Sequence, residues 1–389
     1  TKEEPNMLLC TRRGLGLARA LPRRRALTTT TAAAAVKAAE VPGKIEAILR
    51  SDFGALDAKA GDMLKTLHAS TAPLIWHKHG SFLDHLRDVW LILSAWEQPE
   101  AWCRLGLFHS AYSNSFVSMK AFDIDTDREK LAALIGAEAE NLVYKFCVIN
   151  RQQLEDEVER SGSVGEFRCA SIKTGEEVVL SPQEAAACLT ETIADQMDQS
   201  FSWQSDLEQN KTAALWPGDY APTLRMAKLS VFAKALRDVV PESSLPPVFN
   251  KCSTLLDPEA ERDARDLYVR VVFRNGDATC TDADLTTLLQ ASALNPFVAE
   301  PHLARAQILL QMSRFDDALH AAHAGLDLLC EWATPWDKRM PFHAWLAWAR
   351  CLIFQAHLRE WPNTHGGLES LGAIDSSMRT RPLNTSRTL

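Results

Sequence analysis

The sequence of 389 residues lacks several features that would assign it to a familiar class of protein. Its nine cysteines occur singly, without a Cys-x-x-Cys pair, so we expect neither a disulfide framework nor a cysteine-rich zinc site. No apolar run approaches the roughly 18–20 residues that a membrane span needs, and the richest one, Trp345 to Phe354, is broken by Arg350. A glycine-rich phosphate loop is also missing. These absences favour buried thiols, a reducing compartment and no membrane span.

Acidic residues outnumber Lys/Arg outside the N-terminus. Residues 1–40 hold eight Lys/Arg and three acidic residues, so the net charge of −8 for the whole chain leaves −13 on residues 41–389. Nucleic-acid affinity depends on clustered Lys/Arg that neutralise phosphates, and this acidic part of the chain has no such cluster. We therefore expect no nucleic-acid partner.

The N-terminal segment from Met7 to Val36 has six arginines, no acidic residue and a Thr/Ala-rich end. This composition is typical of a mitochondrial or chloroplast transit peptide, and a disordered basic tail is the alternative. We expect residues 1–40 to be a targeting or disordered segment, with the mitochondrion favoured over the chloroplast as the organelle.

Apolar residues recur at helical spacing through most of the chain and predict a mainly α-helical fold. Residues 127–150 read as two helices separated at Gly136, and Ser181-Pro182-Gln183-Glu184 has the order of a helix start with a capping box. Residues 155–162 are charged and end in Ser-Gly-Ser, which predicts a loop. Two short strand-like segments flank Lys173-Thr174-Gly175 and predict a small β-hairpin, the only sheet expected.

The sequence pattern changes to paired helices after a proline-rich segment. Residues 241–248 contain three prolines, so we place a linker at 241–257 between a helical domain at 44–240 and a second one at 258–372. The second domain has paired helices with small residues at the expected contacts and resembles tetratricopeptide repeats, about one and a half to two units. This resemblance implies a protein partner bound through the C-terminal helices. Residues 373–389 are expected to be disordered.

The stretch from His77 to Asn150 places two histidines at the ends of apolar helical runs. His85 begins one run, and His109 ends the next. Two imidazoles in these positions can meet in space and hold a metal ion, or they can be hydrogen-bonded polar groups in a helical core.

Residues 60–200 resemble the HD superfamily of helical metal-dependent phosphohydrolases, and most of all its alarmone (guanosine tetraphosphate) hydrolase domain. His85 matches the first histidine of that family, and His109 matches the histidine of its His-Asp pair. Gly136 to Val143 matches a Gly-x-Glu helix, and Ala194-Asp195 matches the last ligand. The same stretch resembles an uncharacterised plant and bacterial family that has His-Ser in place of His-Asp. The resemblance implies an HD-like helical bundle with the β-hairpin as an insertion.

This sequence departs from the HD pattern next to the second histidine. Where the family has His-Asp-x-x-Glu-Asp, the chain has His109-Ser110-Ala111-Tyr112-Ser113-Asn114, so three carboxylates are replaced together. Carboxylates balance the charge of a divalent ion and orient the attacking water, so their loss favours a non-hydrolytic domain. The polar side chains of this segment form either a hydrogen-bonded helix cap or a pocket for a small ligand; they are Ser110, Tyr112, Ser113 and Asn114.

The resemblance still implies a two-histidine, one-carboxylate metal site formed by His85, His109 and Asp195. This set of ligands could hold manganese, iron or zinc, although which cofactor the protein uses, if any, is not fixed by the sequence. His77 and His79 are further candidates to replace the lost acids. The alternative for Asp195 is that it forms, with Asp198, a solvated helix face.

Two hypotheses follow from the sequence. In the first, the protein is an organellar binding or scaffold module with a degenerate, non-hydrolytic HD-like domain and a repeat-like tail. In the second, it is a metal-dependent phosphohydrolase or oxygenase of the HD type that uses the three predicted ligands.

Overall fold

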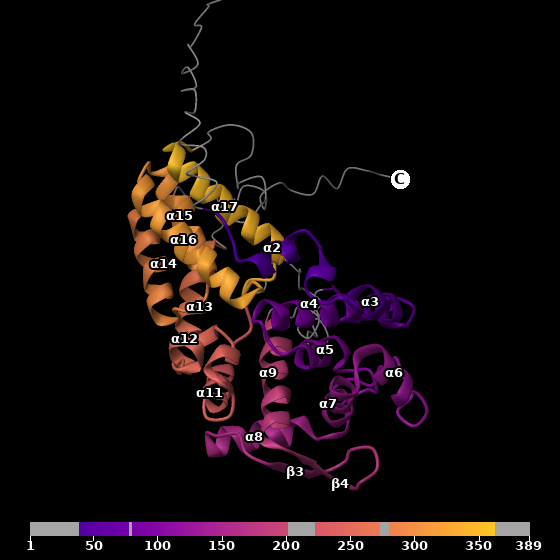
Figure 1. Cartoon of the computed structure of the whole chain (residues 1–389). Helices are drawn as coiled ribbons and strands as arrows, with labels where there is room; N and C mark the ends of the chain where they lie inside the picture. Colours follow the sequence, from indigo (N-terminus) through magenta and orange to yellow (C-terminus); the bar gives the residue numbers. More distant parts are fainter. Residues whose placement is uncertain (1–38, 78–79, 201–221, 273–279, 362–389) are drawn as a thin grey trace, which may run out of the picture.

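The computed structural model describes residues 39–77, 80–200, 222–272 and 280–361. These residues form a mainly helical protein with two small two-stranded sheets, so the predicted fold class is confirmed (Figure 1). Among them, no helix has both the length and the apolar composition that a membrane span requires. Most of the predicted targeting segment and the whole predicted tail at 373–389 lie outside the described residues.

The N-terminal helices are arranged around α9, which contacts α4, α5, α7 and α11. Figure 1 shows α9 running through the middle of this group, with α8 and the β3–β4 hairpin at one end. The elements that precede α9 are α2 (Gly43–Leu49), η1 (Phe53–Ala55), α3 (Ala60–His68), η2 (Ala72–Leu74), α4 (Phe82–Ala95), α5 (Glu100–Phe108), α6 (Arg128–Ile135), α7 (Ala137–Val148) and α8 (Arg151–Ser161). They are followed by α9 (Pro182–Asp198) and α11 (Met226–Leu236).

Local sequence signals set several of these helix ends. Ser181 and Glu184 form the predicted capping box at the start of α9, and Ser81 with Asp84 forms another at the start of α4. Gly136 lies between α6 and α7 with φ of 92°, a conformation that glycine adopts without steric cost. The predicted break of the 127–150 segment at this glycine is therefore confirmed.

The prediction of a loop at residues 155–162 is wrong, because helix α8 extends to Ser161. Leu154 and Val158 are spaced one turn apart and are buried on one face of this otherwise charged helix. A single narrow apolar stripe is a weak periodic signal, and the high charge of the segment hides it.

The predicted hairpin is confirmed: β3 (Phe167–Ala170) pairs antiparallel with β4 (Glu177–Leu180). The expectation that it is the only sheet is wrong, since β1 (Trp76–His77) pairs with β2 (Gly80–Ser81) just before α4. A strand of two residues is too short to show the alternation by which strands are recognised in a sequence.

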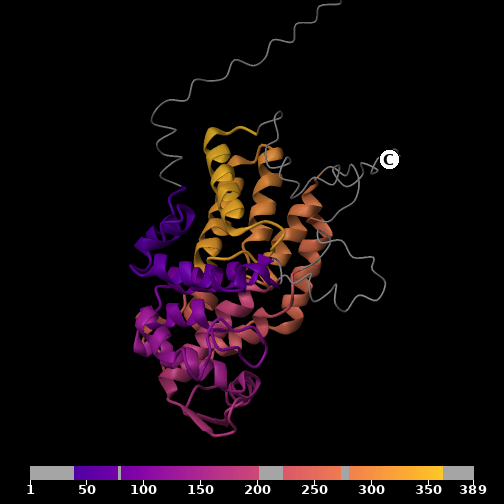
Figure 2. The same ribbon diagram turned by 90° about the vertical axis from the view of Figure 1, so that its right-hand side faces the viewer.

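The described residues of the C-terminal region form consecutive antiparallel helices, and the predicted domain bounds of 258–372 stay a prediction. The helices are α13 (Pro258–Val272), α14 (Asp282–Leu294), α15 (Glu300–Gln311), α16 (Phe315–Trp332) and α17 (Phe342–Leu358). Gly325 allows α16 to approach α15 closely, because a Cβ atom there would lie 2.5 Å from the Cδ2 atom of Leu303. The relation of these helices to tetratricopeptide repeats stays a prediction. Figures 1 and 2 place them at the end of the molecule opposite the β3–β4 hairpin.

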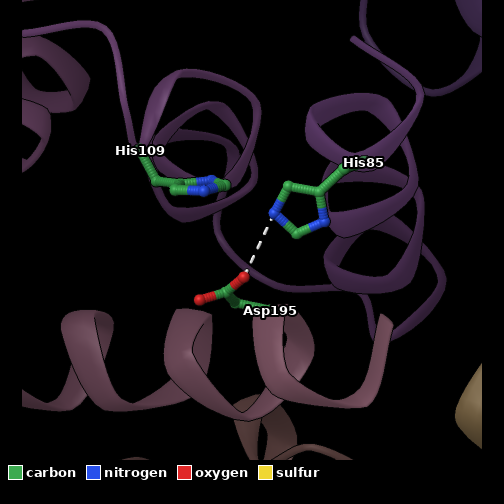
Figure 3. Close-up of side chains that lie close together, drawn as sticks. All are labelled: His85, His109 and Asp195. Carbon is green, nitrogen blue, oxygen red and sulfur yellow. Dashed lines mark ion pairs between the residues drawn. The ribbon is translucent and has the colours of Figure 1, made fainter. Parts of the chain in front are cut away.

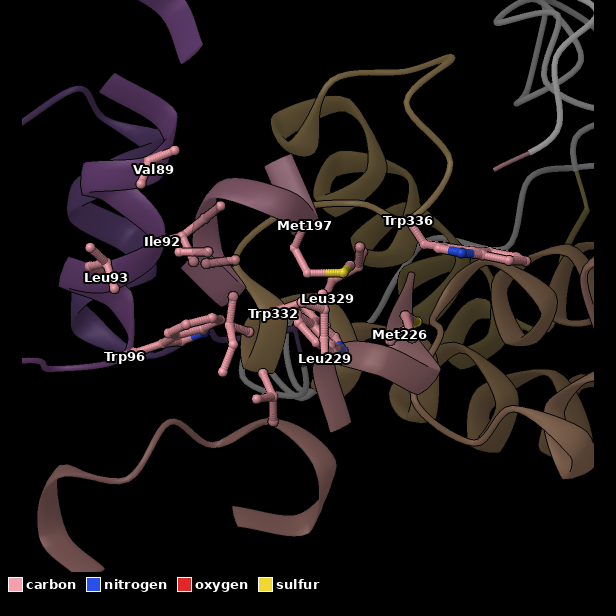
Figure 4. Packing of buried hydrophobic residues seen from close by; sticks show 14 of the residues in the cluster. Val89, Ile92, Leu93, Trp96, Met197, Met226, Leu229, Leu329, Trp332 and Trp336 are labelled. Carbon is pink, nitrogen blue, oxygen red and sulfur yellow. The ribbon is translucent and has the colours of Figure 1, made fainter. Parts of the chain in front are cut away.

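The hydrophobic core is continuous between the N-terminal and C-terminal helices. Trp96 follows α4, packs edge-on against Trp332 of α16 and donates its indole N–H to the Glu331 carbonyl at 2.8 Å (Figure 4). The segment predicted as a linker contains η4 (Glu242–Ser244) and α12 (Val248–Cys252), whose Phe249 is fully buried. The domain boundary stays a prediction, and the two sets of helices share one core.

Candidate metal centre

Two helices bring the predicted histidines together. His85 lies in the first turn of α4, and His109 is the residue that ends α5. Gly106 permits the close contact of these helices, since a Cβ atom there would lie 2.5 Å from the Cδ1 atom of Leu93. The centroids of the two imidazole rings are 5.3 Å apart. The close packing of α4 against α5 therefore places the two imidazole rings next to each other.

The third predicted ligand, Asp195, comes from α9 (Figure 3). One ligand atom from each of His85, His109 and Asp195 lies within 4.8 Å of the other two. The three residues are buried, with exposed fractions of 4%, 1% and 5%. The structure thus assembles the whole predicted set, and the alternative of a solvated face is wrong because Asp195 and Asp198 are both buried.

His109 directs one ring nitrogen toward the centre. Its Nδ1 lies 2.8 Å from the carbonyl oxygen of Gly106, an atom that can only accept a hydrogen bond. Burial lowers the pKa of His109 to about 4, so the ring is neutral at pH 7 and carries a single proton. We assign that proton to Nδ1 from the hydrogen-bond geometry, which leaves a lone pair on Nε2.

His85 is held between two carboxylates. Its Nδ1 lies 2.7 Å from Asp198 and its Nε2 lies 3.2 Å from Asp195. Burial acts to lower the pKa of His85, but the hydrogen bonds with Asp195 and Asp198 outweigh it and raise the pKa to about 10. A carboxylate on Nδ1 is the usual partner of a metal-binding histidine, because it fixes the orientation of the ring. A proton and a cation therefore compete for Nε2 of His85.

Glu191 precedes Asp195 by one turn of α9 and is 1% exposed. Neither of its carboxylate oxygens has a hydrogen-bond partner among the described residues. One oxygen lies 3.3 Å from Nδ1 of His109, but the proton of that nitrogen is directed to the closer carbonyl of Gly106. Burial, and then the negative charge of Asp195, raise the pKa of Glu191 well above its usual value.

Arg151 supplies the positive charge of the centre. It begins α8, and its Nη2 donates a hydrogen bond to Asp195 at 2.9 Å and lies 3.8 Å from Glu191. The guanidinium group also stacks on the ring of Phe146, at 4.3 Å from the centroid. Burial lowers the pKa of Arg151, but Asp195 and Glu191 raise it above its usual value, so the side chain is charged.

The donor set fits a divalent metal ion. Both carboxylate oxygens of Glu191 are buried without a hydrogen-bond partner among the described residues, and buried polar groups normally have one. His85, His109 and Asp195 would hold the ion, and Glu191 could supply a fourth ligand. Two imidazoles with one or two carboxylates suit zinc, manganese or iron. We refer to these four residues, with Asp198 and Arg151, as the metal centre.

Sequence reasoning missed three members of the metal centre. Glu191, Asp195 and Asp198 recur at helical spacing on one face of α9, so the sequence carried a signal for the two extra acids. Arg151 had no comparable signal, because it begins helix α8, whose residues 155–161 were predicted to form a loop.

The segment after His109 is bonded within the protein. The Asn114 side chain donates to the Ser110 hydroxyl at 2.8 Å and accepts the backbone N–H groups of Phe116 and Val117 at 2.9 and 3.0 Å. The remaining two polar side chains bond to other elements: the Tyr112 hydroxyl donates to Glu140 at 2.9 Å, and the Lys173 ammonium donates to Ser113. This arrangement agrees with the helix-cap alternative, and ligand binding by Ser110, Tyr112, Ser113 and Asn114 stays a prediction.

The ring of His77, in β1, lies beside that of His85, with centroids 4.7 Å apart. His79 lies outside the described residues. The proposal that these two histidines replace the lost acids stays a prediction. Glu191 and Asp198 are acidic side chains that lie beside the predicted ligands.

Part of the metal centre lies in a region that is similar to a known domain model. Residues 66–151 match the model of a domain of unknown function, DUF6817. The matched region contains His85, His109 and Arg151, and it ends before α9 with its three acids. No curated protein and no solved structure matches the chain. The relation to the HD superfamily therefore stays a prediction.

Proposed function

We propose that the protein is a metal-binding, non-hydrolytic module in which an HD-like helical domain is joined to a repeat-like scaffold. The observation that carries the proposal is the oriented histidine pair: each Nδ1 lies within hydrogen-bond distance of an oxygen acceptor, Nε2 of His85 faces Asp195, and ligand atoms of His85, His109 and Asp195 lie within 4.8 Å of one another. Orientation of this kind is the usual companion of metal ligation by histidine. The bound ion would join α4, α5 and α9 and so stabilise the domain.

Three features support a binding role over hydrolysis. The predicted ligands are at most 5% exposed, and structural metal sites are closed whereas catalytic ones keep an open position. The residues that replace the family's acids, Ser110, Ser113 and Asn114, take part in hydrogen bonds within the protein. In addition, Arg151 occupies one oxygen of Asp195.

Metal titration of the chelator-treated full chain tests this proposal. We expect one Zn²⁺ or Mn²⁺ per chain by calorimetry and a rise in thermal stability on binding, since a ligand of the folded state stabilises it. His109→Ala should abolish binding, whereas His323→Ala, on α16, should leave it unchanged. Equal metal binding by the wild type and His109→Ala would overturn the proposal.

Glu191 favours hydrolysis as a second candidate function. It is a buried carboxyl next to the predicted ligands with no hydrogen-bond partner. Glu191 could therefore act as the general base, a role that the neutral side chains of Ser110 and Asn114 cannot fill. Guanosine tetraphosphate and p-nitrophenyl phosphate should be tested with metal-loaded protein. Turnover that is lost in Glu191→Gln would support an enzyme, and the absence of turnover above background would rule out this candidate.

The scaffold part of the proposal concerns the C-terminal helices. Because they share a core with α4 and α9, their deletion would expose apolar surface, and a surface variant of the full chain is the better test. Leu289 of α14 is 52% exposed and could contact a protein partner. Leu289→Glu should reduce recovery of partners from an organellar extract, while unchanged recovery would argue against this surface.

A fluorescent fusion of residues 7–45 tests the proposed localisation to an organelle.

A further inference from the structure

A cavity of about 610 Å³ lies between α2, α4 and the segment that joins α16 to α17. Its apolar wall includes Leu49, Phe53, Leu91, Ile92, Met340 and Phe342. The volume is in the range of small-molecule sites, which measure about 300–1,000 Å³ and combine an apolar wall with a few polar groups. Asp198 also lines this cavity, so it borders the metal centre without including the three predicted ligands.

Most charges of the cavity wall are already paired. The Arg87 guanidinium bonds to Asp84 at 2.8 Å and to Asp88 at 2.9 Å, and Asp198 is bonded to His85. Because the single positive charge of Arg87 is shared between two carboxylates, these pairs leave no positive charge for an anionic ligand.

Lys338 is the exception in the wall. Its ammonium group is hydrogen-bonded to the hydroxyl of Thr334, and among the described residues no carboxylate oxygen lies within 4.0 Å of it. Both side chains line the cavity. The negative charges of Asp198, Asp88 and Glu300 act on Lys338 without forming an ion pair with it among the described residues. A cation that bonds a hydroxyl at the edge of an apolar wall is suited to pair with an anion of the ligand.

We propose that this cavity binds a small organic acid with an apolar body and a single negative charge. The carboxylate pairs with Lys338 and Thr334, and the apolar body packs against Leu91 and the neighbouring wall. A second negative charge is disfavoured, because Asp88 and Asp198 line the same cavity. The site shares Asp198 with the metal centre but contains none of the three predicted metal ligands, and the inference does not depend on a bound metal.

Calorimetry with three ligands of one chain length tests the charge preference. The full chain, with a chelator present, is titrated with octanoate, octanol and octyltrimethylammonium. Octanoate should bind at least tenfold more tightly than the other two. In Lys338→Met, octanoate should bind no more tightly than octanol, and octanol binding should be retained. The control variant Lys234→Met, at an exposed position on α11, should keep the wild-type preference for octanoate.

A second variant locates the site independently of Lys338. Leu91→Trp fills the cavity and should abolish binding of both octanoate and octanol, with thermal unfolding used to confirm that the variant is folded. Three outcomes would overturn the inference: no preference for octanoate, a preference that persists in Lys338→Met, or unchanged binding in folded Leu91→Trp. Because the chelator removes metal, a negative result with octanoate would not contradict the proposed metal binding. A negative metal titration would likewise not contradict the proposed binding of an organic acid.

Discussion

The protein contains two buried polar clusters that differ in how completely their groups are bonded. In the C-terminal region, Asp337 accepts hydrogen bonds from Tyr268 at 2.8 Å and from Arg339 at 2.8 Å. One oxygen of Glu300 accepts the backbone N–H groups of Trp336 and Asp337 at 2.6 and 3.0 Å. We call these four side chains, Tyr268, Glu300, Asp337 and Arg339, the C-terminal cluster.

The metal centre differs in two respects. Glu191 has no hydrogen-bond partner on either oxygen, and His109 directs a lone pair inward. The C-terminal cluster contains no imidazole and uses its acids to join α13 and α15 to the segment before α17. In the C-terminal cluster each carboxylate accepts at least two hydrogen bonds, although one oxygen of Glu300 has no partner, whereas Glu191 accepts none. The comparison teaches that a buried acid bonded within the protein is structural, whereas one without hydrogen bonds beside imidazoles has room for a cation.

The largest expected effect is on stability in the C-terminal cluster. Asp337→Ala removes the acceptor of the buried Tyr268 hydroxyl and the carboxylate partner of Arg339, and should cost about 3 kcal/mol of unfolding free energy. Metal affinity of the folded variant should be unchanged. Chemical denaturation and metal titration measure the two quantities, and a variant that loses metal affinity while folded would break the distinction between the clusters.

In the metal centre, Glu191→Gln should act mainly on affinity. The amide has nearly the same shape but no negative charge, so we expect metal affinity to fall about 10–100-fold, as for supporting groups of metal sites. Stability of the metal-free protein should not decrease, because no hydrogen bond is lost. Calorimetry of the two proteins checks this, and equal affinities would show that Glu191 takes no part.

The two close helix contacts offer a matched pair of smaller changes. Gly106→Ala and Gly325→Ala each place a Cβ atom 2.5 Å from a buried leucine, Leu93 or Leu303, and should each cost about 1–3 kcal/mol. Only Gly106→Ala separates the two helices that carry the histidines, so it alone should weaken metal binding. The same loss of affinity in both variants would indicate a general effect of destabilisation.

A pH dependence in the C-terminal cluster gives a further test of the comparison. Burial raises the pKa of Glu300 from 4.5 to about 7, so the folded state holds this proton more tightly than the unfolded state. The contribution of Glu300 to stability is therefore most favourable below pH 4.5 and is lost as the pH rises toward 7. Glu300→Gln keeps an acceptor for the two N–H groups and should flatten this decline. Denaturation at several pH values measures it, and an unchanged slope would contradict the assignment.

The parts of the fold that were predictable depend on local sequence. The break at Gly136 and the capping box at Ser181 are set by a few neighbouring residues, and both were predicted correctly. The burial of Phe249 in the expected linker was not predictable, because it depends on helices distant in the sequence. The β1–β2 pair was missed because its strands have two residues each.

The metal centre was predictable only in part for a similar reason. His85, His109 and Asp195 were proposed from resemblance, and the structure places them together. Glu191 and Asp198 share a helix face with Asp195, but whether an acidic face is buried is decided by what packs against it. Periodicity alone cannot distinguish a solvated stripe of acids from a buried one.

The central claim is that the metal centre holds a divalent ion, and anomalous diffraction from crystals of the metal-loaded protein tests it most directly. We predict one strong anomalous peak that contacts Nε2 of His85, Nε2 of His109 and a carboxylate oxygen of Asp195. A map without a peak among these three side chains, from protein that has been incubated with Zn²⁺ or Mn²⁺, would contradict the account.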